Sequence, residues 1–214
     1  MGNLCSECGM DEAGRGPVFG PMVIAIVCGD SGKMREIGAR DSKSLSPASR
    51  ERIMALIERE KCFWDYTVLT AADLNERMSR QTLNEIEYDA YLSLIMKSPE
   101  GSSIQVDAFD VIEERLQNSL RKDSGRQVTC KHSGDRIFPL VSAASIVAKV
   151  IRDRYVREIR EKYGDIGSGY PADPKTQEFL RKSIQNGWNI DGIVRKRWKT
   201  YIRIKSEYEN KRLF

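Results

Sequence analysis

The sequence predicts an α/β fold whose single sheet has an antiparallel and a parallel section. Three observations lead to this prediction. Strand-like segments come in succession near the N-terminus, later ones alternate with helical segments, and a long, largely apolar helical pattern follows the last of them. In the parallel section, a ligand site is expected beyond the carboxyl ends of neighbouring strands.

Five segments are typical of strands. The clearest is the apolar run 20–29, GPMVIAIVCG, which is bounded by Gly and Pro. Residues 62–70 mix aromatic and β-branched side chains, which favour strands. Segments 102–108 and 126–132 are shorter candidates, and the stretch from Cys8 to Glu12 must be the first strand although its apolar character is weak.

Helical patterns lie between these strands. Ser46 is a plausible N-cap with a proline after it, so we predict a helix over 46–61. Apolar residues at helical spacing predict further helices over 81–98 and 111–120. The longest predicted helix covers 138–164, with its first half buried against the sheet and its second half in solvent.

The proportion of apolar residues falls after GSGYPADP, residues 167–174. Segments 175–188 and 192–214 predict two helices with few apolar positions. We therefore expect an α/β domain over residues 1–166 and a C-terminal helical appendage over 167–214.

Composition limits the function weakly. The 214 residues carry a net charge of +4, so the location of the basic residues matters more than their sum. We find no membrane-length apolar run and no secretory signal, and we expect a cytoplasmic monomer with no membrane partner. An odd number of scattered cysteines argues against a disulfide framework. Cys5 and Cys8 could form half of a zinc site or a redox pair, but no second Cys pair completes a zinc site, which favours a structural thiol pair.

Four acidic residues follow predicted strands. Asp11 and Glu12 close the first strand, Asp107 closes the fourth, and Asp135 lies between the fifth strand and the long helix. If the first, fourth and fifth strands are neighbours, these acids converge at one edge of the sheet. Taken singly, each acid could equally be a solvated loop residue or a helix cap.

A cluster of acids needs a cation or a proton. Two unit charges about 4 Å apart repel by roughly 4 kcal/mol at an effective dielectric constant near 20. Oxygen ligands without His or Cys favour Mg²⁺ or Mn²⁺ over zinc. The single histidine, His132, could shuttle protons near Asp135, but it could equally be structural.

The turn Gly14-Arg15-Gly16 follows the first two acids directly. Two glycines let the backbone approach a ligand closely, and Arg15 adds a fork suited to phosphate. The turn lacks the Gly-Lys-Ser/Thr ending of a P-loop and the three glycines of a dinucleotide fingerprint. It is either a plain tight turn or a cradle for a sugar-phosphate beside metal ions.

Together these segments resemble one family, ribonuclease HII, and most closely its archaeal members. The stretches that carry the resemblance occur in order along about 200 residues: DEAGRGPVFGPMVIA, RDSKSLSP, TLNE, VDAFD, FPLVSAASIVAKVIRDR, GSGYPADP and VRKRWKT. The resemblance implies a ribonuclease H-like fold with a five-stranded mixed sheet flanked by helices. It also implies an endonuclease that cuts RNA in RNA–DNA hybrids and at single ribonucleotides in duplex DNA, leaving 3′-hydroxyl and 5′-phosphate ends.

The resemblance also implies roles for individual residues. Asp11, Glu12, Asp107 and Asp135 match the four catalytic, metal-binding acids, which would hold two Mg²⁺ or Mn²⁺ ions in the substrate complex. The Gly14–Gly16 turn matches the segment that senses the ribose 2′-hydroxyl, and Tyr170 matches a tyrosine at the RNA-to-DNA junction.

Basic residues are candidates for contacts with the nucleic-acid backbone. They are Arg40, Lys43, Arg195, Lys196, Arg197 and Lys199. The last four interleave with Trp198, which we expect to pack while the cations face phosphates.

The chain departs from the family at two places. Ser133 stands where members usually carry a Lys, which puts a nearby backbone or substrate contact in doubt, and the first strand is unusually polar. The nearest alternative is ribonuclease HIII, whose usual N-terminal extension is not seen here, and a different one is a non-catalytic nucleic-acid-binding module. A sliding clamp would dock a short C-terminal motif, for which the tail YENKRLF is only an equivocal match.

Overall fold

The computed structural model describes residues 5–39, 45–60 and 63–211. Within these ranges, no helix combines the length and the apolar character needed to cross a membrane. The chain forms two compact units. The first consists of Met1–Ala13, Val23–Thr67 and Glu87–Ile151, and the second of Gly14–Met22, Val68–Ile86 and Arg152–Phe214. The division expected after residue 166 remains a prediction.

A five-stranded mixed sheet organises the fold, in the order β3-β2-β1-β4-β5. Its strands are β1 (Glu7–Ala13), β2 (Met22–Gly29), β3 (Phe63–Leu69), β4 (Ser103–Asp107) and β5 (Val128–Lys131). β1 is antiparallel to β2 and parallel to β4, which is parallel to β5. The predicted α/β class and the mixed five-stranded sheet are confirmed.

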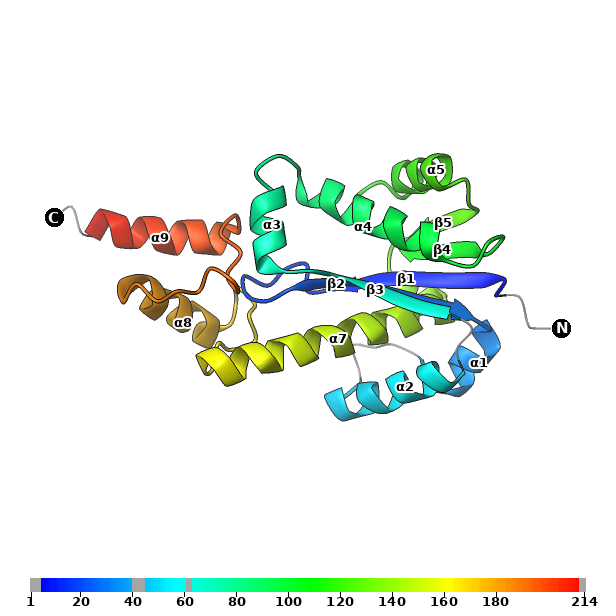
Figure 1. The fold of residues 1–214 in the computed structure, drawn as a ribbon, viewed down its shortest axis with the longest axis horizontal. Helices are drawn as coiled ribbons and strands as arrows, with labels where there is room; N and C mark the ends of the chain where they lie inside the picture. Colours follow the sequence, from blue (N-terminus) through cyan, green and yellow to red (C-terminus); the bar gives the residue numbers. More distant parts are fainter. Residues whose placement is uncertain (1–4, 40–44, 61–62, 212–214) are drawn as a thin grey trace. The chain divides into compact units, whose positions relative to one another are not determined.

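Helices cover both faces of the sheet in the first unit (Figure 1). Figure 1 shows α4 and α5 on one face and α7, α1 and α2 on the other. The bounds are α1 (Ser31–Glu36), α2 (Pro47–Arg59), α4 (Leu83–Lys97), α5 (Glu113–Ser124) and α7 (Pro139–Tyr163). Ser46 caps α2 by accepting a hydrogen bond from the Ser49 backbone, as its sequence predicts.

Three short helices were not predicted: α1, α3 (Ala71–Arg77) and α6 (Gly134–Ile137). α3 carries a signal that could have found it, because Thr70 and Asp73 form a capping box. α6 is a single turn with no such signal; its N-cap, Ser133, has a left-handed backbone and makes no side-chain capping bond.

β1 and α7 touch backbone to backbone at Gly9. A Cβ added to Gly9 would lie 2.1 Å from the carbonyl carbon of Leu140 and 2.2 Å from the backbone nitrogen of Val141. Glycine in a strand interior often marks such a close approach. This contact fixes the start of the buried half of α7 against the strand that carries Asp11 and Glu12.

The sequence argues against a disulfide framework, and this prediction was wrong, because Cys5, Cys8 and Cys28 are disulfide-bonded. Cys8 and Cys28 lie directly opposite each other in the β1–β2 pair and are joined by a disulfide. Strand register, which the count and spacing of cysteines do not reveal, brings the two sulfurs together. Cys130 is buried and free, and burial raises the pKa of its thiol to about 12.

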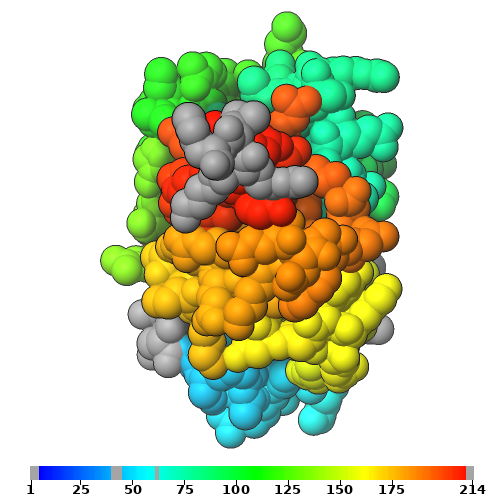
Figure 2. All heavy atoms as spheres, turned by 90° about the vertical axis from the view of Figure 1, so that its left-hand side faces the viewer, coloured from blue at the N-terminus to red at the C-terminus, as the bar shows by residue number. Residues whose placement is uncertain are grey.

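The second unit has its own apolar core. Val18 and Phe19 pack there with residues from the C-terminal part of the chain, including Phe179, Val194 and Ile204. Helices α8 (Pro174–Gln185) and α9 (Lys199–Lys211) lie side by side, as Figure 2 shows in orange and red. The predicted helix over 175–188 is confirmed in type.

The second C-terminal helix begins later than predicted, at Lys199 instead of residue 192. The preceding segment pairs with residues 18–20 instead. Val194 forms an isolated antiparallel bridge with Phe19, and the Arg195 backbone N–H donates to the carbonyl of Val18 at 2.9 Å. Val194 is also held by a hydrogen bond from the Asn75 side chain to its carbonyl oxygen, at 2.8 Å.

Candidate active site

Strand register places two of the predicted acids side by side in the first unit. Met10 of β1 pairs with Val106 of β4, and the two strands run parallel. Asp11 and Asp107 are therefore the next residues along neighbouring strands, at the carboxyl end of β4. This is the edge at which the sequence predicts a site.

Asp135 reaches the same edge through a close approach of its loop to β4. A Cβ on Gly134 would lie 3.2 Å from the Cα of Asp107 and 3.3 Å from the Val106 carbonyl oxygen. The Gly134 backbone N–H donates to Oδ1 of Asp107 at 2.8 Å. Asp135 follows directly and is 4% exposed, so its carboxylate is buried next in sequence to a residue bonded to Asp107.

Asp11 is buried among charges. Burial first, then the charges of Glu12 and Asp107, raise its pKa well above the usual value. A hydrogen bond from Ser145 and the charge of Lys149 act in the opposite direction. Lys149 Nζ also donates to Ser145 Oγ at 2.7 Å, so helix α7 supplies a small network that partly offsets the cost of an ionised Asp11.

Glu12 is held from the other face of the sheet. Tyr91, on α4, is fully buried and donates its hydroxyl to Oε2 of Glu12 at 2.9 Å. Burial and the nearby charges of Glu12, Asp11 and Glu87 raise the pKa of Tyr91 well above its usual value, so the phenol remains a donor. In the sequence Tyr91 looked like one more apolar position of the helix stripe.

The four acids fit a hard divalent cation by their chemistry. Carboxylate oxygens are the donors that such a cation prefers, and its charge would offset the repulsion from Glu12 and Asp107 that helps to raise the pKa of Asp11. No three His, Cys, Asp or Glu side chains in the described ranges form a ready-made metal site. His132 is exposed, and its ring nitrogen Nε2 lies 3.3 Å from the Val111 carbonyl oxygen.

The Gly14–Gly16 turn lies in the second unit, where other residues occupy its carbonyl oxygens. The Arg15 carbonyl accepts a hydrogen bond from Arg195 Nη1, and the Gly16 carbonyl accepts one from Trp198 Nε1, both at 3.2 Å. The Arg15 side chain donates to Asn84 Oδ1 at 2.6 Å. Asn84 belongs to the TLNE stretch, and its contact with Arg15 could not be read from the sequence.

Tyr170 lies beside this turn. A Cβ on Gly16 would be 3.5 Å from the Tyr170 ring, and the Val18 backbone N–H donates to the Gly169 carbonyl at 2.8 Å. The Tyr170 side chain is 46% exposed. The structure thus brings together the two segments predicted to recognise the ribonucleotide.

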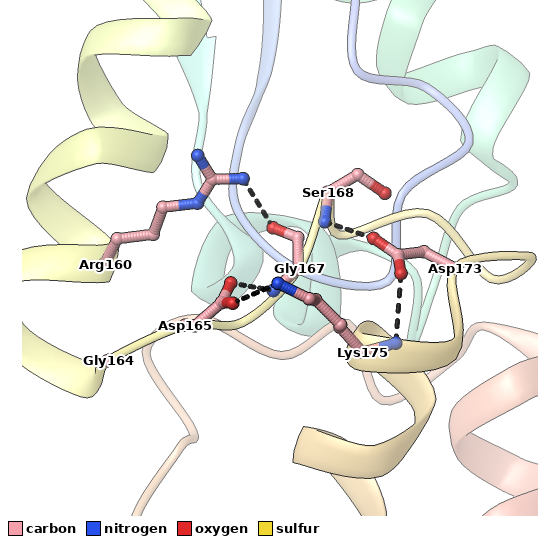
Figure 3. Close-up of a pocket in the computed structure, with 7 residues that line it drawn as sticks. All are labelled: Arg160, Gly164, Asp165, Gly167, Ser168, Asp173 and Lys175. Atoms are coloured by element: carbon pink, nitrogen blue, oxygen red, sulfur yellow. Dashed lines mark hydrogen bonds and ion pairs between the residues drawn. The ribbon is translucent and has the colours of Figure 1, made fainter.

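Hydrogen bonds hold the loop that contains Ser168 and Asp173, which also carries Tyr170 (Figure 3). Asp173 accepts hydrogen bonds from the backbones of Ser168 and Lys175, and Arg160 donates to the Gly167 carbonyl at 2.6 Å. These residues line a pocket, but they are bonded to one another, as the dashed lines in Figure 3 show. We read this pocket as the support of the loop.

The prediction for the basic segment was wrong for Arg195. Its side chain is fully buried and donates to the carbonyls of Gly20 and Arg15, because residues 193–195 pair with the segment after the turn. Lys196 is half-buried and forms an ion pair with Asp191 at 2.8 Å, whereas Arg197 and Lys199 are exposed. Arg40 and Lys43, which were also predicted to contact the nucleic-acid backbone, lie outside the described residues.

The chain is similar to known proteins over nearly its whole length. The family model for ribonuclease HII matches residues 8–201. Ribonuclease HII of Thermoplasma volcanium is 50% identical over 210 residues, which cover 97% of this chain and 98% of that protein.

Two solved structures are also similar. In the PCNA:RNase HII complex from Archaeoglobus fulgidus, the similar chain is 42% identical, covers 91% of this chain and 95% of its own length, and has a TM-score of 0.85. Bst-RNase HIII in complex with Mn²⁺, at 21% identity and a TM-score of 0.77, covers 97% of this chain and 72% of its own and shares the fold. The chain belongs to the ribonuclease HII family.

Proposed function

We propose that this ribonuclease HII cuts RNA in RNA–DNA hybrids and ribonucleotides embedded in DNA by using Asp11, Glu12, Asp107 and Asp135 to hold Mg²⁺ or Mn²⁺. One observation supports it above the others: burial and the charges of Glu12 and Asp107 raise the pKa of Asp11 at the carboxyl edge of the sheet. Asp11 and Asp135 are buried and Glu12 and Asp107 half-buried, and acids in such surroundings are stable when a cation shares the site.

Residues around the acids orient them and set their charge. Tyr91 fixes one oxygen of Glu12, and Ser145 with Lys149 favours the ionised form of Asp11. When bound, two divalent ions lower the pKa of the attacking water and stabilise charge on the phosphate and the leaving oxygen. Cleavage on the 5′ side of a ribonucleotide then leaves a 3′-hydroxyl and a 5′-phosphate without a protein nucleophile.

The experiment that tests this proposal is a titration with Mg²⁺ and with Mn²⁺ on a labelled duplex that holds one ribonucleotide. We expect cleavage at that nucleotide, no cleavage of the all-DNA duplex, and full loss of activity in EDTA. A protein that binds the duplex equally well with and without metal and yields no product would instead be a non-catalytic binding module.

Recognition of the ribose falls to the turn and Tyr170 in this proposal. The turn meets the ribose with its backbone, which is held in place because the carbonyls of Arg15 and Gly16 accept hydrogen bonds from Arg195 and Trp198. A donor left unpaired when a deoxyribose replaces a ribose can exclude the wrong substrate by factors of roughly 10⁴. Tyr170 lies against Gly16 and can pack its ring on the next sugar.

Replacing Tyr170 by alanine tests its part in this recognition. Because the ring is half exposed, we expect Tyr170→Ala to fold normally but to cut an isolated ribonucleotide about 10–100-fold more slowly, the range of one lost stacking contact. The check is single-turnover cleavage, with Tyr155→Ala, another partly exposed tyrosine, as the control. Equal rates for Tyr170→Ala and the wild type would remove Tyr170 from the site.

The hydroxyl of Tyr91 offers a separate test of the acid cluster. Tyr91→Phe keeps the buried ring but deletes the hydrogen bond to Glu12. Loss of a residue that orients a metal ligand typically lowers metal affinity or activity by about 10–100-fold. We therefore expect the Mg²⁺ concentration for half-maximal cleavage to rise about 10-fold while the affinity for duplex in metal-free buffer stays unchanged. An unaltered Mg²⁺ requirement would contradict this role.

A sliding clamp is the protein partner we propose, by likeness to the Archaeoglobus fulgidus relative solved with PCNA. The expected attachment is the C-terminal tail, residues 208–214, of which 212–214 lie outside the described residues. Calorimetry with the clamp of the same organism should show binding by the full chain and none by a chain ending at residue 207. Equal binding by both would place the contact elsewhere.

A further inference from the structure

Arg152, in the second half of α7, is a buried cation, and two of its three donor nitrogens lack acceptors among the described residues. Its side chain is 7% exposed, and neither Nε nor Nη2 has a hydrogen-bond partner among the residues that the structure describes. Burial lowers the pKa of this guanidinium. A buried charge of this kind destabilises a fold unless an anion or a set of acceptors compensates it.

Arg152 touches both segments assigned above to ribonucleotide recognition. A Cβ on Gly14 would lie 2.3 Å from its Nε and 2.4 Å from its Cδ. On another side, its guanidinium carbon is 5.8 Å from the centre of the Tyr170 ring. The side chain therefore lies between the turn and the tyrosine, within the second unit.

The contact with Tyr170 does not satisfy the donors of Arg152. A ring face attracts the positive charge of a guanidinium, but the N–H groups point outward in the guanidinium plane. Nε and Nη2 form one edge of that plane, and two parallel N–H groups on such an edge match two oxygens of a phosphate. The unpartnered atoms are thus the pair that a phosphodiester can bind.

We propose that Arg152 binds the phosphate that joins the ribonucleotide to the following deoxynucleotide. The assignment rests on the proposed function, in which the turn reads the ribose and Tyr170 packs on the next sugar. One phosphate joins those two sugars, and Arg152 lies between the turn and Tyr170, which contact them in this proposal. Since Nε and Nη2 are buried here, the phosphate reaches them when the exposed Tyr170 ring moves from the guanidinium onto the sugar.

The first experiment uses the wild-type protein, so that its outcome is independent of how any variant folds. A neutral methylphosphonate replaces the phosphate on the 3′ side of the ribonucleotide, in both stereoisomers. The control duplex carries the methylphosphonate three nucleotides further along. We expect the first substitution to weaken binding and cleavage about 10–100-fold, the range for a charge-assisted hydrogen bond, and the control to change them less than about 3-fold.

The second experiment asks whether Arg152 is the residue that senses this charge. Arg152→Gln should weaken binding of the unmodified duplex as much as the methylphosphonate does, and the two changes together should cost little more than either alone. Arg154→Gln removes a positive charge from an exposed position of the same helix. In this control variant, the methylphosphonate should weaken binding as much as it does in the wild type. Circular dichroism of both variants reports that they are folded.

Two results would overturn the assignment. One is a wild-type protein that tolerates the methylphosphonate at this position. The other is a folded Arg152→Gln variant that still suffers the full penalty, which would make Arg152 a structural support of Tyr170. Binding is measured in metal-free buffer, separately from cleavage. A protein that binds with this phosphate preference but cuts nothing would refute the proposed function and still support the contact between Arg152 and the phosphate.

Discussion

Asp11→Asn should abolish cleavage and make the metal-free protein more stable. Asparagine has nearly the shape of aspartate, and its oxygen can still accept the 2.7 Å hydrogen bond from the Glu12 backbone. It lacks the charge that a divalent ion requires. We expect single-turnover cleavage to fall by on the order of 10³-fold or more, with duplex binding in metal-free buffer little changed.

The gain in stability follows from the pKa of Asp11, which burial and then the charges of Glu12 and Asp107 raise. A carboxyl with a higher pKa in the folded chain binds more protons there than in the unfolded chain. Stability therefore falls as the pH rises from the unfolded pKa, near 4, through the folded value. Above that range the wild type bears the full cost of the buried charge, and the variant bears none.

Thermal unfolding without divalent ions measures this difference. Near pH 8 the variant should melt higher than the wild type, by about 2–4 °C for each kcal/mol of relief in a chain of this size. The gap should close as the pH approaches about 4, where the wild-type carboxyl is protonated. Cleavage at the wild-type rate, or a variant that melts several degrees lower near pH 8, would contradict the role given to Asp11.

Gly9→Ala should damage the fold itself. The added Cβ meets backbone atoms of Leu140 and Val141 at 2.1 and 2.2 Å, and backbone cannot rotate away as a flexible side chain can. Overpacking typically costs about 1–3 kcal/mol, and a clash with the backbone belongs at or above the upper end. We expect the unfolding temperature to drop by about 6–12 °C or the protein to fail to fold.

Gly29→Ala is the matched control for this change. Gly29 ends the neighbouring strand, and a Cβ there would make ordinary contacts, at 3.6 Å from Met34 and 4.0 Å from Leu140. Its unfolding temperature should stay within about 2 °C of the wild type. Similar losses in the two variants would mean that α7 does not depend on the close approach at Gly9.

The sequence predicted the parts of the fold that depend on local patterns. The apolar run that became β2 and the N-cap at Ser46 are local signals, and both held within a few residues. The predicted start of α9 was wrong, because residues 192–198 follow a helical pattern but Val194 instead forms a bridge with Phe19, which lies far away in the chain. The Cys8–Cys28 disulfide was missed for the same reason, because it depends on strand register.

The candidate site divides in a similar way. The four acids were visible because three of them lie at the end of a predicted strand and Asp135 follows one, and parallel strands end at a common edge. Their supports, Tyr91, Ser145 and Lys149, looked like ordinary helix positions, because only tertiary packing places them against carboxylates. Arg195 misled the prediction, since a basic side chain in a basic segment gives no local sign that it is buried.

The role of the four acids as metal ligands can be tested by diffraction from crystals soaked in Mn²⁺, recorded at the manganese absorption edge. We expect an anomalous peak at the carboxyl edge of the sheet, within coordination distance of oxygens of Asp11 and of at least two of Glu12, Asp107 and Asp135. A protein that cleaves the duplex in Mn²⁺ while manganese binds only away from these four side chains would contradict this role.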